Sequence, residues 1–332
     1  MTTKQAVLTA LFQDKTYCSG QQLCDQLQIS RTAVWKVMQQ LREEGYEIES
    51  APNRGYRLVK APDLMTAEQV SSCLHTVWAG KEILYFPVIG STNNEIRRLA
   101  EEGAEHGLLA VADRQEGGKG RRGRSWGTPP GEGIAMSLLV RPKDLPPERA
   151  SMMTLVMGLA LASACSKCYG LDVRIKWPND IVAEGRKISG TLTEMSCDPD
   201  QINYLVIGTG INVRQREFPE EIRQTAISLS MLMGDQEEKL YRAELIAACL
   251  EEFERYYALF MQTQSMELLR EEYNSLLAGK DQAVRVLEPG NEYTGTSRGI
   301  NAMGELLVEK EDGEFTAVYA GEVSVRGIYG YV

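Results

Sequence analysis

Histidine is almost absent from this chain, with only His75 and His106 among 332 residues. Neither lies in a motif, so acid–base catalysis by imidazole has little support. A zinc site is also disfavoured, because Cys165 and Cys168 have metal-ligand spacing but no second pair of ligands. We interpret these two cysteines as parts of a buried helix, and we expect the chemistry to depend on other side chains.

Long apolar runs are missing as well. The longest, residues 152–165, is shorter than the roughly 20 residues that a membrane-spanning helix needs, and it predicts a buried helix instead. The first residues have no apolar core of a secretory signal, and the seven cysteines form an odd set. These features predict a cytoplasmic protein that has no membrane partner.

The charge of the chain is unevenly distributed. With 36 Lys and Arg against 46 Asp and Glu, the net charge of −10 argues against a generic nucleic-acid binder. Residues 1–60 nevertheless contain eight basic and six acidic residues, so a mildly basic head precedes an acidic body. The length, with 43% hydrophobic and 25% charged residues, predicts two or three folded domains.

Residues 1–63 show the pattern of a DNA-binding domain. Apolar residues predict helices around 7–12, 23–27 and 34–41, followed by a hairpin over residues 48–58. This is the order of a winged helix-turn-helix, whose second helix of the pair enters the DNA major groove. The residues expected at DNA are Ser30, Arg31, Thr32, Lys36, Arg54 and Arg57. A small interaction module is the alternative.

Two further domains are predicted. Residues 64–278 alternate helices and strands, which is typical of a mixed α/β domain, with a buried helix over 151–169. Its strands are expected at 83–88, 108–112, 134–140, 173–177, 188–195 and 204–213. Residues 279–332 contain short strands, at 283–287, 293–300, 305–310, 315–319 and 322–328, which favour a small β-barrel. The predicted fold class is therefore multidomain α+β.

A basic segment rich in glycine indicates the chemistry. Seven glycines fall within residues 117–133, together with Lys119, Arg121 and Arg122. Glycine lets backbone N–H groups face an anion, and the cations add charge-assisted contacts to phosphate oxygens. The segment lacks the Gly-Lys-Ser/Thr of a P-loop, which disfavours Walker-type phosphoryl transfer. It is either a phosphate-binding segment, with Trp126 as a flat face for a purine, or a flexible loop that contacts nucleic acid.

Five motifs follow one another in the order found in biotin protein ligases. They are Ser-Thr-Asn at 91–93, Gly-Lys-Gly-Arg-Arg-Gly-Arg at 118–124, Lys-Trp-Pro-Asn-Asp at 176–180, Gly-Arg-Lys-Ile-Ser-Gly at 185–190 and Gly-Thr-Gly-Ile-Asn at 208–212. With the winged helix in front, the chain resembles the family of bifunctional biotin protein ligases and biotin operon repressors over essentially its whole length. The resemblance implies a biotin/lipoate ligase-like, class II synthetase-like central domain and an SH3-like C-terminal barrel.

The resemblance also implies a function. Biotin would be activated with ATP to biotinyl-5′-AMP, with Mg²⁺ bridging the departing pyrophosphate, and then transferred to a specific lysine of a biotin carboxyl carrier protein. The chain would repress biotin genes at operator DNA, with the adenylate as corepressor. A ligand-promoted homodimer would bring two heads to a two-fold operator.

Roles for individual residues follow from the same resemblance. Biotin would be bound by Ser91, Thr92, Asn93, Gln115, Lys119, Gly120, Arg121 and Lys187. The nucleotide would be bound by Gly118, Arg121, Arg122, Arg124, Trp126, Lys176, Asn179, Asn212 and Arg326. Arg121 and Lys187 would stabilise the charge that develops at the α-phosphate, and Asp180 would accept the proton of the attacking lysine amine. No residue is predicted to hold a metal ion.

Several of these residues also have a simpler interpretation. Asp180 and Asn212 could be ordinary turn residues, Lys176 could pair with a carboxylate, and Arg326 could be an exposed strand residue. Lys119 stands where the family more usually has arginine, which gives up the planar two-donor fork. Two other functions use part of the pattern: a repressor that senses a small molecule without catalysis, and a ligase for lipoate or another carboxylic acid.

Overall fold

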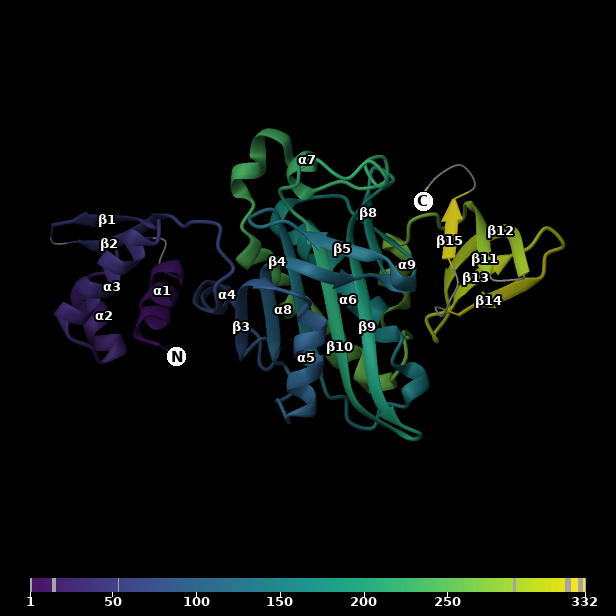
Figure 1. The fold of residues 1–332 in the computed structure, drawn as a ribbon, viewed down its shortest axis with the longest axis horizontal. Helices are drawn as coiled ribbons and strands as arrows, with labels where there is room; N and C mark the ends of the chain where they lie inside the picture. Colours follow the sequence, from purple (N-terminus) through teal and green to yellow (C-terminus); the bar gives the residue numbers. More distant parts are fainter. Residues whose placement is uncertain are drawn as a thin grey trace. The chain divides into compact units, whose positions relative to one another are not determined.

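The computed structural model describes residues 2–13, 16–52, 54–288, 291–319, 324–327 and 331. They form two compact units (Figure 1). The first unit spans Met1–His75 together with Tyr241–Ala247, and the second spans Thr76–Leu240 together with Ala248–Val332. The predicted boundary at residue 63 lies inside the first unit and the one at residue 278 inside the second.

The first unit contains the predicted winged helix-turn-helix. Its elements are α1 (Thr3–Gln13), α2 (Gly20–Leu27), α3 (Arg31–Glu43), β1 (Glu47–Ala51), β2 (Gly55–Lys60) and α4 (Ala67–Cys73). Ser19 begins α2 with a capping box, in which its side chain accepts from the backbone of Gln22 and the Gln22 side chain accepts from the backbone of Ser19. Strands β1 and β2 are antiparallel. Buried apolar side chains from α1, α2 and α3 fill the core, as the helical spacing predicted.

A mixed sheet is the centre of the second unit. Its strands are β3 (Ile83–Ile89), β4 (Leu109–Lys119), β5 (Ser125–Thr128), β6 (Gly133–Val140), β7 (Arg174–Lys176), β8 (Asp180–Ala183), β9 (Arg186–Asp198) and β10 (Gln201–Asn212). The order is β3-β4-β6-β10-β9-β8-β7, and β5 pairs with β4 outside this path. The pair β3–β4 is parallel, whereas the other pairs described in this sheet are antiparallel. The strands predicted for this domain are confirmed.

The glycine-rich segment forms the end of one strand, a tight turn and a second strand. Strand β4 continues through it to Lys119, a 3-10 turn η1 (Arg121–Gly123) follows, and β5 then runs back antiparallel to β4. A Cβ atom at Gly118 would lie 2.3 Å from the carbonyl oxygen of Trp126. Glycine is therefore required at residue 118 for the close approach of two strands, which gives it a role other than flexibility.

Helices alternate with these strands along the chain, and several of them contact the sheet. They are α5 (Thr92–Glu101), α6 (Met152–Tyr169), α7 (Leu229–Met233), α8 (Arg242–Thr263) and α9 (Arg270–Leu276), with 3-10 turns η2 (Pro147–Arg149) and η3 (Gly234–Lys239). Helix α6 confirms the predicted buried helix and ends at Gly170, whose φ is +65°. The segment Pro147–Tyr169 has the length and apolar composition of a membrane span, but 67% of its most apolar window is buried in the protein core. Cys165 is buried in it, whereas Cys168 is exposed.

The last five strands form a separate antiparallel sheet in the second unit. They are β11 (Ala283–Glu288), β12 (Asn291–Ile300), β13 (Leu306–Glu309), β14 (Phe315–Val318) and β15 (Ser324–Gly327), in the order β14-β13-β12-β11-β15. The strand predicted over 322–328 extends at both ends beyond the described residues. Trp177 Nε1 donates a hydrogen bond of 3.0 Å to the carbonyl oxygen of Gly304, so this sheet is anchored beside the Lys-Trp-Pro-Asn-Asp motif.

Candidate active site and DNA-binding surface

Two adjoining cavities lie at one end of the central strands of the large sheet. An inner cavity is formed by β4, β6, β9 and β10 with the start of α5, and an outer cavity extends from it toward β7, β8 and β15. Both cavities are lined by Gly120, Arg121, Trp126, Asn179 and Lys187. Any molecule that extends from one cavity to the other must pass these five residues.

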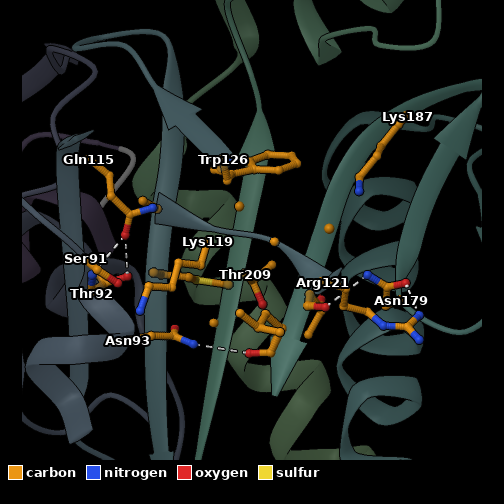
Figure 2. A pocket seen from close by; sticks show the side chains of 18 residues that line it. Ser91, Thr92, Asn93, Gln115, Lys119, Arg121, Trp126, Asn179, Lys187 and Thr209 are labelled. Atoms are coloured by element: carbon orange, nitrogen blue, oxygen red, sulfur yellow. Dashed lines mark hydrogen bonds between the residues drawn. The ribbon is translucent and has the colours of Figure 1, made fainter. Parts of the chain in front are cut away.

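The inner cavity brings together every residue predicted to bind biotin (Figure 2). These residues are Ser91, Thr92, Asn93, Gln115, Lys119, Gly120, Arg121 and Lys187. Figure 2 shows Trp126 and Lys187 on the upper side of the cavity and Asn93 on the lower side. Ala135, Met136 and Leu192 add an apolar surface. A cavity that combines apolar walls with amide and hydroxyl groups suits a ligand with an apolar body and a polar ring.

The start of α5 places two hydroxyl groups at this cavity. Ser91 is the N-cap of the helix, and its side chain accepts from the backbone N–H of Asn94, so this serine also has a structural role. The backbone N–H and the hydroxyl of Thr92 both donate to Oε1 of Gln115 on β4, at 2.9 and 3.1 Å. These bonds leave the Gln115 amide nitrogen as a donor toward the cavity.

Asn93 is fixed by residues that the sequence motifs did not reveal. Its Nδ2 donates to Glu194 Oε2 at 2.6 Å, and its Oδ1 lies 2.6 Å from the buried hydroxyl of Ser137. A Cβ atom at Gly208 would lie 2.0 Å from the same Oδ1. Glycine in the Gly-Thr-Gly-Ile-Asn motif thus makes room for Asn93, and the network holds the amide in one orientation.

Trp126 lies at the boundary between the two cavities. It is a residue of β5, and Lys187 Nζ lies 5.4 Å from the centre of its ring. A Cβ atom at Gly210 would lie 2.2 Å from the indole nitrogen, so only glycine at this position lets the ring lie against β10. The position is compatible with the predicted stacking on adenine, which stays a prediction.

Asp180 is a buried carboxylate with a cationic partner. It begins β8, opposite Lys176 on β7, and Lys187 Nζ lies 2.6 Å from its Oδ1. Burial lowers the pKa of Lys176 to about 8, although the charge of Asp180 opposes this shift. Asp180 and Lys176 are therefore parts of one charged cluster. Asp180 is thus not simply a turn residue, and Lys176 is not simply one half of an isolated ion pair.

Arg121 reaches the junction from the 3-10 turn of the glycine-rich segment. Its Nη1 donates to Asn179 Oδ1 at 3.0 Å, and Asn179 Nδ2 donates in turn to the carbonyl oxygen of Thr191 at 3.2 Å. Burial lowers the pKa of Arg121, but arginine titrates so far above neutral pH that the guanidinium stays charged. The asparagine of the Lys-Trp-Pro-Asn-Asp motif thus orients an arginine of the preceding motif.

The outer cavity contains most of the residues predicted to bind the nucleotide. Its lining includes Arg121, Arg122, Arg124, Trp126, Lys176, Asn179, Asn212 and Arg326, together with Asp180 and Lys187. The sequence reasoning missed Gln215, Phe218, Pro219 and Ile222, which also line it. Apolar residues in a segment otherwise rich in charge, 214–224, are the signal that could have found them.

Two of the residues predicted to bind the nucleotide have structural roles. Gly118 lines neither cavity, because it lies in the β4–β5 pairing. Asn212 lines the outer cavity, but its Nδ2 points to the backbone carbonyl oxygens of Lys187 and Ile227, at 3.4 and 3.3 Å. Asn212 thereby connects β10 to the segment that follows it.

The residues predicted at DNA lie on α3 and on the β1–β2 hairpin. Ser30 is the N-cap of α3 and accepts from the backbone N–H of Ala33. Arg31 Nη2 donates to Gln21 of α2 at 2.8 Å, whereas Thr32 and Lys36 are exposed on the same helix. The start of α3 therefore presents hydroxyl and cationic groups to solvent.

The two arginines of the hairpin share a partner that the sequence did not indicate. Arg54 and Arg57 lie over the ring of Tyr17, with their guanidinium carbons 4.4 and 5.1 Å from its centre. Arg57 also forms an ion pair of 2.6 Å with Glu49. Tyr17 therefore holds both arginines on one side of the wing. Asn53, in the predicted turn, lies outside the described residues.

Comparison with known proteins places these sites in a family. A model of the biotin/lipoate A/B protein ligase family matches residues 85–212, an HTH domain matches 3–57, and the biotin protein ligase C-terminal domain matches 281–326. The bifunctional ligase/repressor BirA of Bacillus spizizenii is 38% identical over 313 residues, which cover 93% of this chain and 94% of that protein. This chain belongs to the bifunctional ligase/repressor BirA family. The BirA protein of Escherichia coli is 32% identical over 321 residues, 96% of each chain.

A solved structure has a similar fold. Biotin protein ligase from Aquifex aeolicus, in complex with biotin and ATP, is 31% identical with a TM-score of 0.65. The match covers 74% of this chain and 99% of that one. The ligase-family match at 85–212 includes the whole predicted biotin set, whereas Phe218, Ile222 and Tyr331 of the outer cavity lie beyond the three matched ranges.

Proposed function

We propose that this BirA-family chain activates biotin with ATP and transfers it to a lysine of a biotin carboxyl carrier protein. The observation that carries the proposal is the position of Arg121 and Lys187, which line both cavities where they meet. Biotin in the inner cavity and ATP in the outer one would meet at these two cations. Their anionic groups can approach each other only where positive charge has already been placed.

The first step joins the two substrates. A carboxylate oxygen of biotin attacks the α-phosphorus of ATP, the bond to the bridging oxygen of the β-phosphate breaks, and pyrophosphate leaves. Arg121 is held by Asn179 and Lys187 by Asp180, so both cations face the oxygens on which charge develops. Trp126 would stack on the adenine of the product, biotinyl-5′-AMP.

The second step transfers biotin to the carrier protein. The lysine nitrogen attacks the carbonyl carbon of the adenylate, an amide bond forms, and the bond to the AMP oxygen breaks. The amine must lose a proton, and Asp180, a carboxylate in the lining of the outer cavity, is the proposed acceptor.

Mg²⁺ is proposed to enter with ATP, coordinated by its phosphate oxygens. Arg122, Arg124, Lys176 and Arg326 also line the outer cavity, a donor set that fits a polyphosphate. Among the residues described in the structure, no cluster of three or more His, Cys, Asp or Glu side chains could hold a metal ion. Mg²⁺ would supply neutralisation of the β- and γ-phosphate charge.

The winged helix supports a second role as a repressor of biotin genes. We propose that its exposed Thr32 and Lys36 contact operator DNA, with Arg54 and Arg57 at the wing. Biotinyl-5′-AMP would be the corepressor, by promoting a homodimer that presents two heads to a two-fold operator. A cytoplasmic location is proposed because ATP is available there and the described residues contain no disulfide between any of the seven cysteines.

Mass spectrometry of a purified carrier protein tests the ligase function. Incubation with ATP, Mg²⁺, biotin and the chain should add one biotinyl group to the carrier. No mass increase would favour the noncatalytic repressor that only senses a small molecule. Competition between biotin and lipoate in a pyrophosphate-release assay separates the two acids, and preference for lipoate would overturn the proposed substrate.

A further inference from the structure

Tyr331 comes after the last strand of the five-stranded sheet in the chain, and its side chain lies in the active site. It follows β15 and lies five residues past the end of the matched C-terminal domain at residue 326. Its hydroxyl donates a hydrogen bond to Oδ2 of Asp180, and its ring lines the outer cavity. Lys187 Nζ lies 2.6 Å from the other carboxylate oxygen, Oδ1. Asp180 is therefore held from both sides, by a cation and by a phenol.

The environment of Tyr331 keeps its hydroxyl a donor. Burial, and then the negative charge of Asp180, raise the pKa of the phenol, so it stays protonated at neutral pH. Lys176 Nζ lies 4.0 Å from the centre of the ring, a cation–π contact on the side of β7. The charged groups that act on this pair are Lys176, Lys187, Arg121, Arg124 and Arg326.

We propose that Tyr331 is a positioning residue for the transfer step, because its hydroxyl orients Asp180 to accept the proton of the acceptor lysine. This inference rests on the proposed function. Each carboxylate oxygen has two acceptor sites, so Oδ2 can accept the phenol hydrogen and still receive the amine proton. In the step, the lysine nitrogen bonds to the acyl carbon, the bond from that carbon to the AMP oxygen breaks, and the amine proton passes to Asp180.

The substitution Tyr331→Phe distinguishes the contribution of the hydroxyl from that of the ring. It removes the hydrogen bond to Asp180 but keeps the aromatic surface beneath Lys176 and along the outer cavity. Transfer from preformed biotinyl-5′-AMP to a purified biotin carboxyl carrier protein should slow about tenfold at pH 7 in single turnover. Adenylation, measured as biotin-dependent pyrophosphate exchange, should slow less than transfer, because the Tyr331 ring, Arg121 and Lys187 are kept.

The two half-reactions distinguish this role from a merely structural one. A general structural defect would slow adenylation and transfer alike, whereas loss of a hydrogen bond to the proposed proton acceptor should slow transfer more than adenylation. Tyr204→Phe is the matched control, because the Tyr204 hydroxyl also donates to a carboxylate, Glu101 at 3.2 Å, outside both cavities.

Three outcomes would contradict the inference. Unchanged transfer in Tyr331→Phe would overturn it, as would an equal slowing of both half-reactions, which is the signature of a general structural defect. Transfer slowed to the same extent in Tyr204→Phe would overturn it too. A parent chain that exchanges no pyrophosphate with biotin would refute the proposed function itself, and the inference with it.

Discussion

Lys187 offers the sharpest test of the adenylation site, through the substitution Lys187→Met. Methionine keeps an unbranched chain of similar length but removes the ammonium group that lies 2.6 Å from Asp180 Oδ1 and 5.4 Å from the centre of the Trp126 ring. The variant therefore probes one charge at the junction of the two cavities, with little change in packing volume.

The expected magnitudes follow from the position of Lys187. Removing a preplaced donor from a developing oxyanion costs about 100- to 1000-fold in rate, so adenylation should slow by that factor. Breaking a fully buried ion pair costs about 3 to 5 kcal/mol, and an exposed pair about 0 to 1 kcal/mol. The side chains of Lys187 and Asp180 are 25% and 9% exposed, which is intermediate. The free energy of unfolding should accordingly fall by about 2 kcal/mol.

Biotin-dependent pyrophosphate exchange and thermal unfolding measure these two effects. Arg186→Met is the matched control, because Arg186 is the preceding residue on β9, lines neither cavity and pairs with the largely exposed Glu184 at 2.8 Å. Its exchange rate should match that of the parent. If Lys187→Met exchanged pyrophosphate as fast as Arg186→Met, the assignment of the cavity junction to the reacting phosphate would be wrong.

Three more predictions concern the pocket, the nucleotide and DNA. Raising the pH through 8 should increase the KM for ATP, because Lys176 has a pKa of about 8 and loses its charge there; in Lys176→Arg the increase should disappear. Gly208→Ala should weaken biotin binding in calorimetry and lower stability by about 1 to 3 kcal/mol, because its Cβ would meet Asn93 Oδ1 at 2.0 Å. Trp35 lies on α3 beside Lys36, and Val59 lies on β2; their side chains are 54% and 56% exposed. Trp35→Ala should weaken binding to promoter DNA in a mobility-shift assay, whereas Val59→Ala should not. Equal effects at these two positions would count against α3 as the recognition helix.

Local sequence patterns were sufficient for most of the secondary structure, and the resemblance carried by the motifs was sufficient for most of the candidate site. Apolar segments predicted the strands of the central sheet and the buried helix α6, and helical spacing predicted the winged helix, since these patterns reflect which face of an element is buried. The motif at 91–93 and the glycine-rich segment were expected to meet, and the structure brings them together in the inner cavity. For the glycine-rich segment a flexible loop stayed open as an alternative, because composition does not show whether glycine serves flexibility or close strand approach.

Contacts between segments far apart in the chain were beyond the reach of the sequence alone. Asn93 and Glu194 meet because α5 is packed against strands whose register is fixed by the whole sheet. Asp180 and Tyr331 meet because the five-stranded sheet is anchored beside β7 and β8. Sequence by itself determined the elements, the order of the motifs and the chemical groups they carry. Tertiary structure decided which groups touch, because pairing, register and packing depend on the combined burial of all elements and not on any one segment.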